Sequence, residues 1–366
     1  MRILLDCRPL QYAGTDSELS RMIFSGAAGL VSGEPVEWLY LVDHHYRPGS
    51  ISWLSDRSVL VCRAFPGKPG WRWWYGRQVP RLAKRYKADR VMLTGGMAAA
   101  LPVPQYIWMP GIVDRRDRRL AVTLSRAAGV FCFSERDRSF LASRQPGMED
   151  RIVLVRPEPD GVIAPLSPGE REEAKSSFAG GKEYFLAVMT GARLEGVLNL
   201  LKAFSLFKKR QLSNMQLVIV LRDRISGKDA KEKLTTYKYR EDLHWVDLWQ
   251  EGMRASQQDE LRKMTGAAYA LLFPFAGDGL GVPIVNAWKA WVPVIAGPGG
   301  NNREIGGEAV LYGDPEDLAE LAGQMMLIYK DEVRRNGLIE KGRDRLYSFQ
   351  EDRPGTAVWK AIQKIN

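Results

Sequence analysis

The pattern of hydrophobic and polar positions alternates short apolar runs with longer amphipathic segments along most of the chain. Such runs, separated by helical segments, are typical of strands in a mostly parallel sheet, because these strands are buried on both faces. The strands we predict cover residues 3–5, 36–42, 59–62, 90–93, 105–109, 129–134, 184–188, 216–220, 268–273, 292–296 and 309–312. We predict one helix that begins near Asp16, and further helices over residues 77–86, 119–127, 198–209, 317–330 and 331–347. The pattern therefore predicts an α/β fold.

The segment 155–168 interrupts this alternation with four prolines, which fit neither a helix interior nor a central strand. We interpret it as a linker between two domains, because single cores rarely grow beyond about 250–300 residues and the chain has 366. We predict a Rossmann-like domain over 1–160, a second over 161–345, and a helix in 346–366 that packs back toward the first. Two doubly wound halves around a hinge form a cleft, with ligands at the carboxyl ends of the strands.

A glycine-rich stretch follows the strand that ends at residue 273, and it reads Gly277-Asp278-Gly279-Leu280-Gly281-Val282-Pro283. Glycines let backbone N–H groups approach a ligand closely, and the helix that follows adds a partial positive charge at its start. Proline in the first turn of that helix costs no hydrogen bond. The spacing favours a phosphate site, and the alternative is a tight strand-to-helix turn without a ligand. A GxGxxG fingerprint is absent after the first strand, which argues against a dehydrogenase.

The formal net charge is +10, and much of it lies in one stretch. From Arg63 to Arg90 there are nine basic residues and one acid, interleaved with Trp71, Trp73, Trp74 and Tyr75. An anionic membrane surface attracts such a stretch, and a single-stranded nucleic acid would also suit it. The third interpretation is a solvated helix whose aromatic side chains pack inward. Of the two functional interpretations we favour the membrane and expect no nucleic-acid partner, because no RNA-binding signature accompanies the stretch.

Targeting signals and cysteine spacing bear on the compartment. Cys7, Cys62 and Cys132 lie far apart, so we expect neither a disulfide framework nor a zinc site, and favour a reducing compartment. The apolar start of the chain turns charged at Asp6, which does not fit a secretory signal, and the longest apolar run, 267–276, is short of the ~20 residues of a spanning helix. We therefore expect a cytoplasmic protein, or one peripheral on the inner face of the plasma membrane.

The triplet Asp43-His44-His45 allows two interpretations. Carboxylate and imidazole groups together bind metals, so a metal phosphoesterase site is one of them. A surface loop at the end of a strand is the other, and we favour it. We expect no metal and no cofactor.

Several segments in order along the chain resemble those of one family, and they are 3–11 with Gly14, 73–81, 130–135, 184–186, 200–204, 237–242, 292–295 and 326–332. Together with the glycine-rich stretch they resemble the GT4-type retaining glycosyltransferases of the GT-B fold, and look closest to the bacterial group that assembles cell-surface polysaccharides. The resemblance covers nearly the whole chain. It implies two Rossmann-like domains facing across a cleft, the first binding a glycan or lipid-linked acceptor and the second a nucleotide-diphosphate sugar.

The resemblance also implies roles for individual residues. The family carries two glutamates separated by seven residues, which contact the donor sugar and the nucleotide ribose, and here these positions are Asp278 and Asn286. An Arg-Lys pair that grips the diphosphate corresponds to Arg193 and Glu195. We thus expect Asp278 and Arg193 to be catalytic, and the remaining donor contacts to come from Gly279, Leu280, Gly281, Val282, Asn286 and Glu195.

On the acceptor side we expect Gly14 and Met109, the latter where the family often has a histidine. Retaining transfer in this fold lets the leaving diphosphate take the acceptor proton, so positioning and phosphate stabilisation are the protein's main tasks. Two hypotheses follow. The chain is an active sugar transferase, or, because Met109, Glu195, Asp278 and Asn286 depart from the family pattern, it is a non-catalytic binding or scaffold subunit. Contacts to the sugar and base are expected from loops around 243–253.

Overall fold

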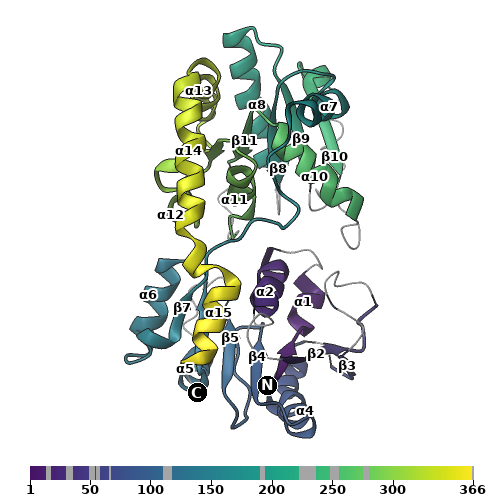
Figure 1. Cartoon of the computed structure of the whole chain (residues 1–366), viewed down its shortest axis with the longest axis vertical. Helices are drawn as coiled ribbons and strands as arrows, with labels where there is room; N and C mark the ends of the chain where they lie inside the picture. The colour runs from purple at the N-terminus through teal and green to yellow at the C-terminus, as the bar shows by residue number, and fades with distance from the viewer. Residues whose placement is uncertain are drawn as a thin grey trace. The chain divides into compact units, whose positions relative to one another are not determined.

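The computed structural model describes residues 1–13, 18–29, 36–48, 54, 58–65, 67–109, 118–189, 194–221, 236–247, 255–274 and 280–364. The chain forms two compact units (Figure 1). Unit 1 comprises Met1–Pro157 together with Gln350–Asn366, and unit 2 comprises Glu158–Phe349. The chain thus leaves unit 1 after residue 157, where we predicted 160, and returns to it at 350, where we predicted 346.

Unit 1 is built on a seven-stranded sheet in the order β3-β2-β1-β4-β5-β6-β7, with all neighbours parallel. The strands are β1 (Arg2–Asp6), β2 (Glu37–Asp43), β3 (Val59–Cys62), β4 (Arg90–Leu93), β5 (Gln105–Trp108), β6 (Gly129–Cys132) and β7 (Ile152–Leu154). Every residue of β5 and β6 is buried. Burial on both faces explains why these strands read as continuous apolar runs.

Helices cover both faces of this sheet. They are α1 (Arg8–Ala13), α2 (Glu18–Gly29), α3 (Gly67–Trp73), the π-helical turn η2 (Trp74–Gln78), α4 (Val79–Arg85), α5 (Arg118–Arg126), α6 (Glu135–Arg144), the 3-10 turns η3 (Glu149–Arg151) and η6 (Gln350–Asp352), and α15 (Pro354–Gln363). One hydrophobic cluster joins η2, α4, α5 and α6 to the sheet. Helix α15 packs on α2, and it also contacts β6 and β7. The packing is tight, since a Cβ atom on Gly26 would lie 3.1 Å from both Trp108 and Val358.

Unit 2 is built on a six-stranded parallel sheet in the order β10-β9-β8-β11-β12-β13. Its strands are β8 (Tyr184–Met189), β9 (Gln216–Leu221), β10 (Leu243–Asp247), β11 (Ala270–Phe273), β12 (Val294–Ala296) and β13 (Val310–Tyr312). All residues of β8, β11 and β12 are buried, as expected for the centre of a doubly wound sheet.

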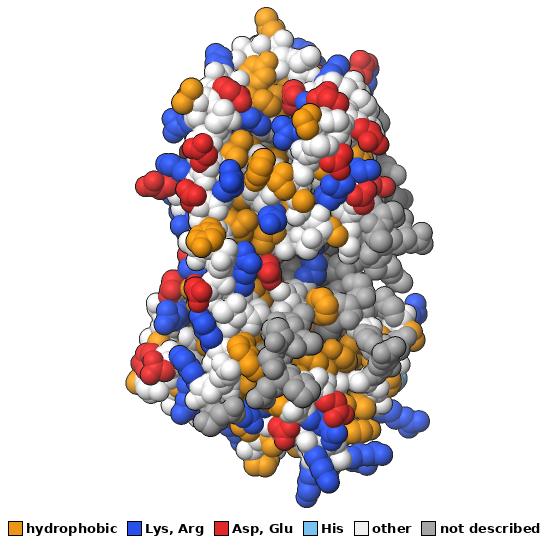
Figure 2. All heavy atoms as spheres, in the orientation of Figure 1, with side chains coloured by type: hydrophobic (Ala, Val, Ile, Leu, Met, Phe, Trp, Pro, Cys, Tyr) orange, Lys and Arg blue, Asp and Glu red, His pale blue; other side chains and the backbone are white. Residues whose placement is uncertain are grey.

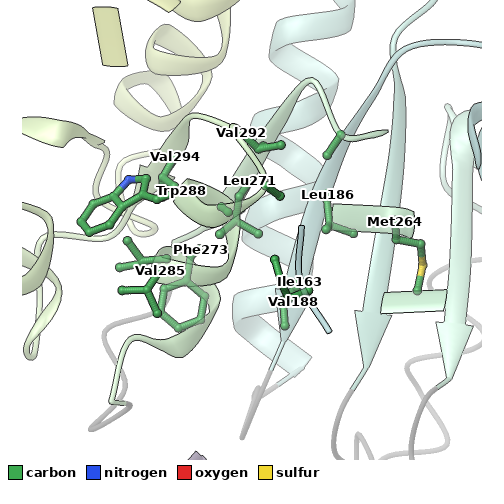
Figure 3. Close-up of a cluster of buried hydrophobic side chains, with 14 of the residues drawn as sticks. Ile163, Leu186, Val188, Met264, Leu271, Phe273, Val285, Trp288, Val292 and Val294 are labelled. Atoms are coloured by element: carbon green, nitrogen blue, oxygen red, sulfur yellow. The ribbon is translucent and has the colours of Figure 1, made fainter. Parts of the chain in front are cut away.

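The helices of unit 2 are α7 (Pro168–Ala179), α8 (Leu194–Gln211), η4 (Arg240–Asp242), α10 (Ala255–Ala267), α11 (Val282–Lys289), α12 (Asn302–Gly306), η5 (Gly307–Ala309), α13 (Leu318–Lys330) and α14 (Glu332–Ser348). Helices α7, α10 and α11 share one hydrophobic cluster with the sheet, part of which is drawn in Figure 3. Helices α8 and α13 share the cluster on the other face. Each unit is therefore a three-layer α/β structure.

All the predicted strands are present with small shifts at their ends, but two edge strands were not predicted. Strands β7 and β10 each have a single partner, and β10 carries polar residues where we expected loops. In β10 the polar residues His244 and Asp247 interrupt the apolar run, and β7 is apolar but has only three residues, too few to stand out as a strand. Residues 155–167 lie in no helix or strand, so only the last residue of the predicted linker falls in a helix. Pro168 begins α7, capped by Ser167, whose hydroxyl accepts from the N–H of Glu170. Proline is tolerated there because a helix start leaves its N–H unused.

Candidate functional site

The strand order of unit 2 reverses between β8 and β11. In doubly wound sheets, ligands bind outside the carboxyl ends of the strands at such a reversal. The connection after β8 leads to α8, and the connection after β11 leads to α11. The residues predicted to bind the donor belong to these two connections and to the helices that follow them. Of them, Arg193, Asp278 and Gly279 lie outside the described residues.

The start of α11 is shaped by Gly281. Its φ of 74° lies in the left-handed region that favours glycine, and a Cβ atom there would come within 2.4 Å of Ile305 Cδ1. The side chains of Leu280 and Val282 are buried. An anion at this helix start would meet the backbone N–H groups of Gly281 and Val282. The next two residues offer none, because Pro283 has no N–H and the N–H of Ile284 donates to the Gly281 carbonyl at 3.0 Å.

Asn286 lies further along α11 and is 4% exposed. Its Oδ1 accepts from the backbone N–H of Asp160 at 2.8 Å, and its Nδ2 donates to Oδ2 of Asp160 at 2.8 Å. Sequence reasoning placed Asp160 in the linker and missed this pairing. No sequence signal marks it, because the two residues are 126 positions apart. The predicted contact of Asn286 with a ribose stays a prediction.

Glu195 lies in the first turn of α8 and is exposed. A carboxylate at this position interacts favourably with the partial positive charge of the helix start. The same carboxylate repels a diphosphate at close range. Glu195 thus fits a stabilising role in the helix, and its predicted place beside the donor is compatible with its position after β8.

A second glycine-rich loop follows β12, the neighbour of β11, and was missed by the sequence reasoning. It reads Gly297-Pro298-Gly299-Gly300-Asn301 and leads into α12. Asn302 is 1% exposed, and its Nδ2 donates to the Gly297 carbonyl at 3.1 Å, which fixes the loop. The two adjacent glycines were the available signal. The loop leaves the same edge of the sheet as the start of α11.

The strand order of unit 1 reverses between β1 and β4, and the buried carboxylate of Asp6 ends β1 there. Its oxygens accept from Trp74 Nε1 at 3.1 Å, Tyr75 Oη at 2.8 Å and the N–H of Arg8 at 3.3 Å. Burial raises the pKa of Asp6 to about 6, although these hydrogen bonds oppose the shift. Thr94 after β4 donates to the Asp6 carbonyl at 2.7 Å. Asp6 therefore joins β1, β4 and the helices that cross between β3 and β4.

Arg8 forms a buried ion pair at the same edge of the sheet. Its Nε donates to Asp43 Oδ2 at 3.0 Å, and its Nη2 donates to the Phe65 carbonyl at 3.0 Å. Its Nη1 has no hydrogen-bond partner among the residues that the structure describes. The guanidinium carbon lies 4.1 Å from the ring centre of Trp71 and 4.8 Å from that of Trp74. The faces of the two aromatic rings compensate part of the buried charge.

The candidate metal ligands Asp43, His44 and His45 do lie close together, with ligand atoms within 4.8 Å of one another. Asp43 is however paired with Arg8, and His44 Nδ1 accepts from the N–H of Ala64 at 3.3 Å. Burial raises the pKa of Asp43, but the hydrogen bonds from Tyr12, His45 and Arg8 outweigh it and hold the pKa below its ordinary value. A guanidinium beside the carboxylate disfavours a cation, so this geometry does not fit a metal site.

Of the two residues predicted on the acceptor side, Met109 and Gly14, only Met109 lies among the described residues. Met109 follows β5, is 5% exposed and packs in the core of unit 1. Its Cε would lie 4.0 Å from a Cβ atom added to Gly96, in the loop that follows β4. Met109 is therefore a core residue that lies near the loop at the β1–β4 reversal. Gly14 lies outside the described residues.

The basic stretch from Arg63 to Arg90 turns its aromatic side chains inward, as the helical alternative predicts. Trp74 and Tyr75 are buried, and Trp71 and Trp73 are half-buried against the same core. The exposed basic residues are Arg63, Arg72, Arg77, Arg81, Lys84, Arg85 and Lys87. Figure 2 shows Lys and Arg side chains projecting at the end of unit 1 where Figure 1 places α4. Phe65 is 59% exposed beside this surface.

No helix in the described part of the chain is long and apolar enough to cross a membrane. Contact of the basic stretch with a membrane surface stays a prediction.

Comparison with known proteins identifies relatives of the whole fold. Residues 169–345, just under half of the chain, match the family model of glycosyl transferases group 1. HepE of Anabaena, solved with UDP and glucose, has a TM-score of 0.70 at 13% identity, covering 100% of this chain and 98% of its own. Sucrose-phosphate synthase of Thermosynechococcus elongatus has a TM-score of 0.72 at 15% identity, covering 100% and 99%.

A third similar structure is WaaG, a glycosyltransferase involved in lipopolysaccharide biosynthesis, with a TM-score of 0.69 at 15% identity and full coverage of both chains. No curated protein matches the chain in sequence. Identities this low show the fold alone, and the family model adds the activity class for most of unit 2. The chain thus has the GT-B fold of two parallel-sheet Rossmann-like units, and the group 1 match together with that fold supports a glycosyltransferase enzyme.

Proposed function

We propose that this protein transfers a sugar with retention from a nucleotide-diphosphate sugar to a glycan or lipid-linked acceptor, as a GT4-type enzyme of cell-surface polysaccharide assembly. The observation that carries the proposal is the start of α11 at the β8–β11 reversal, where the backbone N–H groups of Gly281 and Val282 would bind a phosphate of the donor. HepE was solved with UDP and glucose, and WaaG acts in lipopolysaccharide biosynthesis, which supports this donor and this context.

The proposed chemistry asks little of side chains. The acceptor oxygen bonds to the anomeric carbon as the bond from that carbon to the diphosphate oxygen breaks on the same face. The acceptor proton passes to the leaving diphosphate, so neither a side-chain base nor a metal is needed. The helix start and Arg193 stabilise the charge that develops on the diphosphate, and Asp278 holds the sugar. Unit 2 thereby binds the donor, and unit 1 binds the acceptor.

A non-catalytic binding or scaffold subunit is the second candidate. Two observations favour it. The exposed acid Glu195 lies at the start of α8, where a diphosphate-binding lysine is expected. The side-chain amide of Asn286 is hydrogen-bonded to Asp160. Such a protein would bind the nucleotide without turning it over.

Replacing Glu195 by lysine should raise the affinity for nucleoside diphosphates about tenfold, because a repulsive charge near the diphosphate becomes attractive. Calorimetric titration with UDP-glucose, UDP, GDP and ADP measures this, followed by assays of slow donor hydrolysis. Glu173→Lys on α7 is the matched control, since it makes the same charge change elsewhere on unit 2. If none of the four ligands binds the wild type, the proposed donor site is wrong. Binding without hydrolysis or transfer favours the scaffold.

We further propose a cytoplasmic protein that docks on an anionic membrane through the basic stretch. Replacing Arg72 and Arg77 by glutamine and Phe65 by serine should weaken binding to phosphatidylserine vesicles at least tenfold, since each basic residue contributes about 1 kcal/mol there. Co-sedimentation measures this. The control is Lys289→Gln with Lys330→Gln, which removes the same charge from exposed positions of unit 2. Equal binding by the triple variant and the wild type would exclude this surface.

A further inference from the structure

Asp160 is held beside α11 by two hydrogen bonds with the side-chain amide of Asn286. Asn286 Oδ1 accepts from the Asp160 backbone N–H and Asn286 Nδ2 donates to Oδ2 of Asp160, both at 2.8 Å. Because Asn286 is 4% exposed on a packed helix, its own orientation is fixed. The buried amide therefore fixes both the backbone and the carboxylate of Asp160, which is half-buried.

The position of this pair relates it to the proposed phosphate site. Asn286 lies four residues after Val282 on α11, which is about 6 Å along the helix axis. The carboxylate of Asp160 is thus held about one turn from the helix start that the proposed function assigns to the donor diphosphate. All of these residues belong to unit 2.

The chemistry of the donor suits a carboxylate at that place. In a nucleotide-diphosphate sugar the ribose follows directly after the phosphate, and it carries two neighbouring hydroxyls. Hydrogen bonds from hydroxyls to an ionised acceptor are about twice as strong as those to a neutral one. A carboxylate accepts through about four lone-pair positions, so its bond with the Asn286 amide is compatible with accepting from a ligand.

We propose that Asp160 accepts hydrogen bonds from the ribose hydroxyls of the donor nucleotide, and that Asn286 is a positioning residue that acts through Asp160. The inference rests on the proposed function and changes one of its assignments. The carboxylate that contacts the ribose is that of Asp160, in the segment before α7. Asn286 on α11 supplies the amide that orients this carboxylate. The site thereby selects ribonucleotides over deoxyribonucleotides.

The competing explanation is that the pair only ties the segment after residue 157 to α11. The two explanations differ in how a variant responds to the ligand. A lost structural tie weakens every nucleotide alike. A lost ribose contact weakens only nucleotides that carry the hydroxyl.

Calorimetric titration of UDP, 2′-deoxy-UDP and 3′-deoxy-UDP tests the proposal on the wild type and on Asp160→Asn, which keeps the shape of the side chain. The wild type should prefer UDP over at least one deoxy analogue about tenfold. Asp160→Asn should lose about tenfold in UDP affinity and change little toward that analogue. Asn286→Ala should reduce the same preference, and Glu158→Gln, which removes an acid from the same segment, should retain it.

The outcomes separate this inference from the proposed function. If UDP, GDP and ADP all fail to bind the wild type, the donor site fails and the inference with it. If GDP or ADP binds the wild type more tightly than UDP, the same titrations are made with that diphosphate and its two deoxy analogues. Equal binding of the diphosphate and both deoxy analogues by the wild type, or an unchanged preference in Asp160→Asn, overturns the inference and leaves the donor site intact. Thermal unfolding of each variant confirms that it folds.

Discussion

Replacing Arg8 by methionine should lower the free energy of unfolding of unit 1 by about 3–5 kcal/mol. Arg8 is 2% exposed and the side chain of Asp43 is fully buried, so the variant leaves a buried carboxylate without its cation. Methionine fills the space of the aliphatic part of the arginine but donates no hydrogen bond to Asp43 or to the Phe65 carbonyl.

Urea unfolding followed by tryptophan fluorescence measures this loss, since Trp71 and Trp74 lie against the guanidinium. The double variant Arg8→Met with Asp43→Asn should lose less than the sum of the two single variants, because it removes both charges of the pair. The matched control is Arg138→Met on α6, whose exposed ion pair with Glu135 should contribute less than about 1 kcal/mol. Additive losses would show that the pair is not coupled.

The second large effect concerns pH. Because burial raises the pKa of Asp6 to about 6 from an ordinary value of 3.8, the folded protein holds this proton more tightly than the unfolded chain. The stability that Asp6 contributes is therefore fully present below about pH 4 and is lost as the pH rises through 6. A shift of about two pH units corresponds to about 3 kcal/mol.

Asp6→Asn removes this titration and keeps acceptor geometry toward Trp74 and the N–H of Arg8. The free energy of unfolding of the wild type minus that of the variant should fall by about 3 kcal/mol between pH 3 and pH 7. Urea unfolding at a series of pH values measures the difference, which cancels the titration of all other groups. A difference that does not change with pH would mean that Asp6 titrates at its ordinary value.

Most of the fold follows from local pattern. The apolar runs of β5, β6, β8 and β11 predict central parallel strands because burial on both faces leaves few polar positions, and the one in β5, Gln105, is hydrogen-bonded to the backbone of Ala99. The start of α11 could likewise be predicted, since Gly281 and Pro283 are typical of the residues that begin a helix. Such a helix start is readable from sequence because the backbone geometry that it needs restricts the residue type.

The contacts that sequence reasoning missed join residues far apart in the chain. Asp160 meets Asn286 across 126 positions, and Arg8 meets Asp43 across 35. Neither pair has a local signal, because an aspartate before a glycine reads as a turn and an arginine after a strand reads as surface. The basic stretch was harder still, since its tryptophans face the core while its charges face outward.

The return of the chain to unit 1 after residue 349 has a consequence for the order in which the protein assembles. Unit 2 is one continuous segment, and all of it is synthesised before α15 is made. Until then the part of the first sheet that α15 contacts, in β6 and β7, lacks this helix. Unit 1, whose synthesis begins first, therefore completes its fold after all of unit 2 has been synthesised.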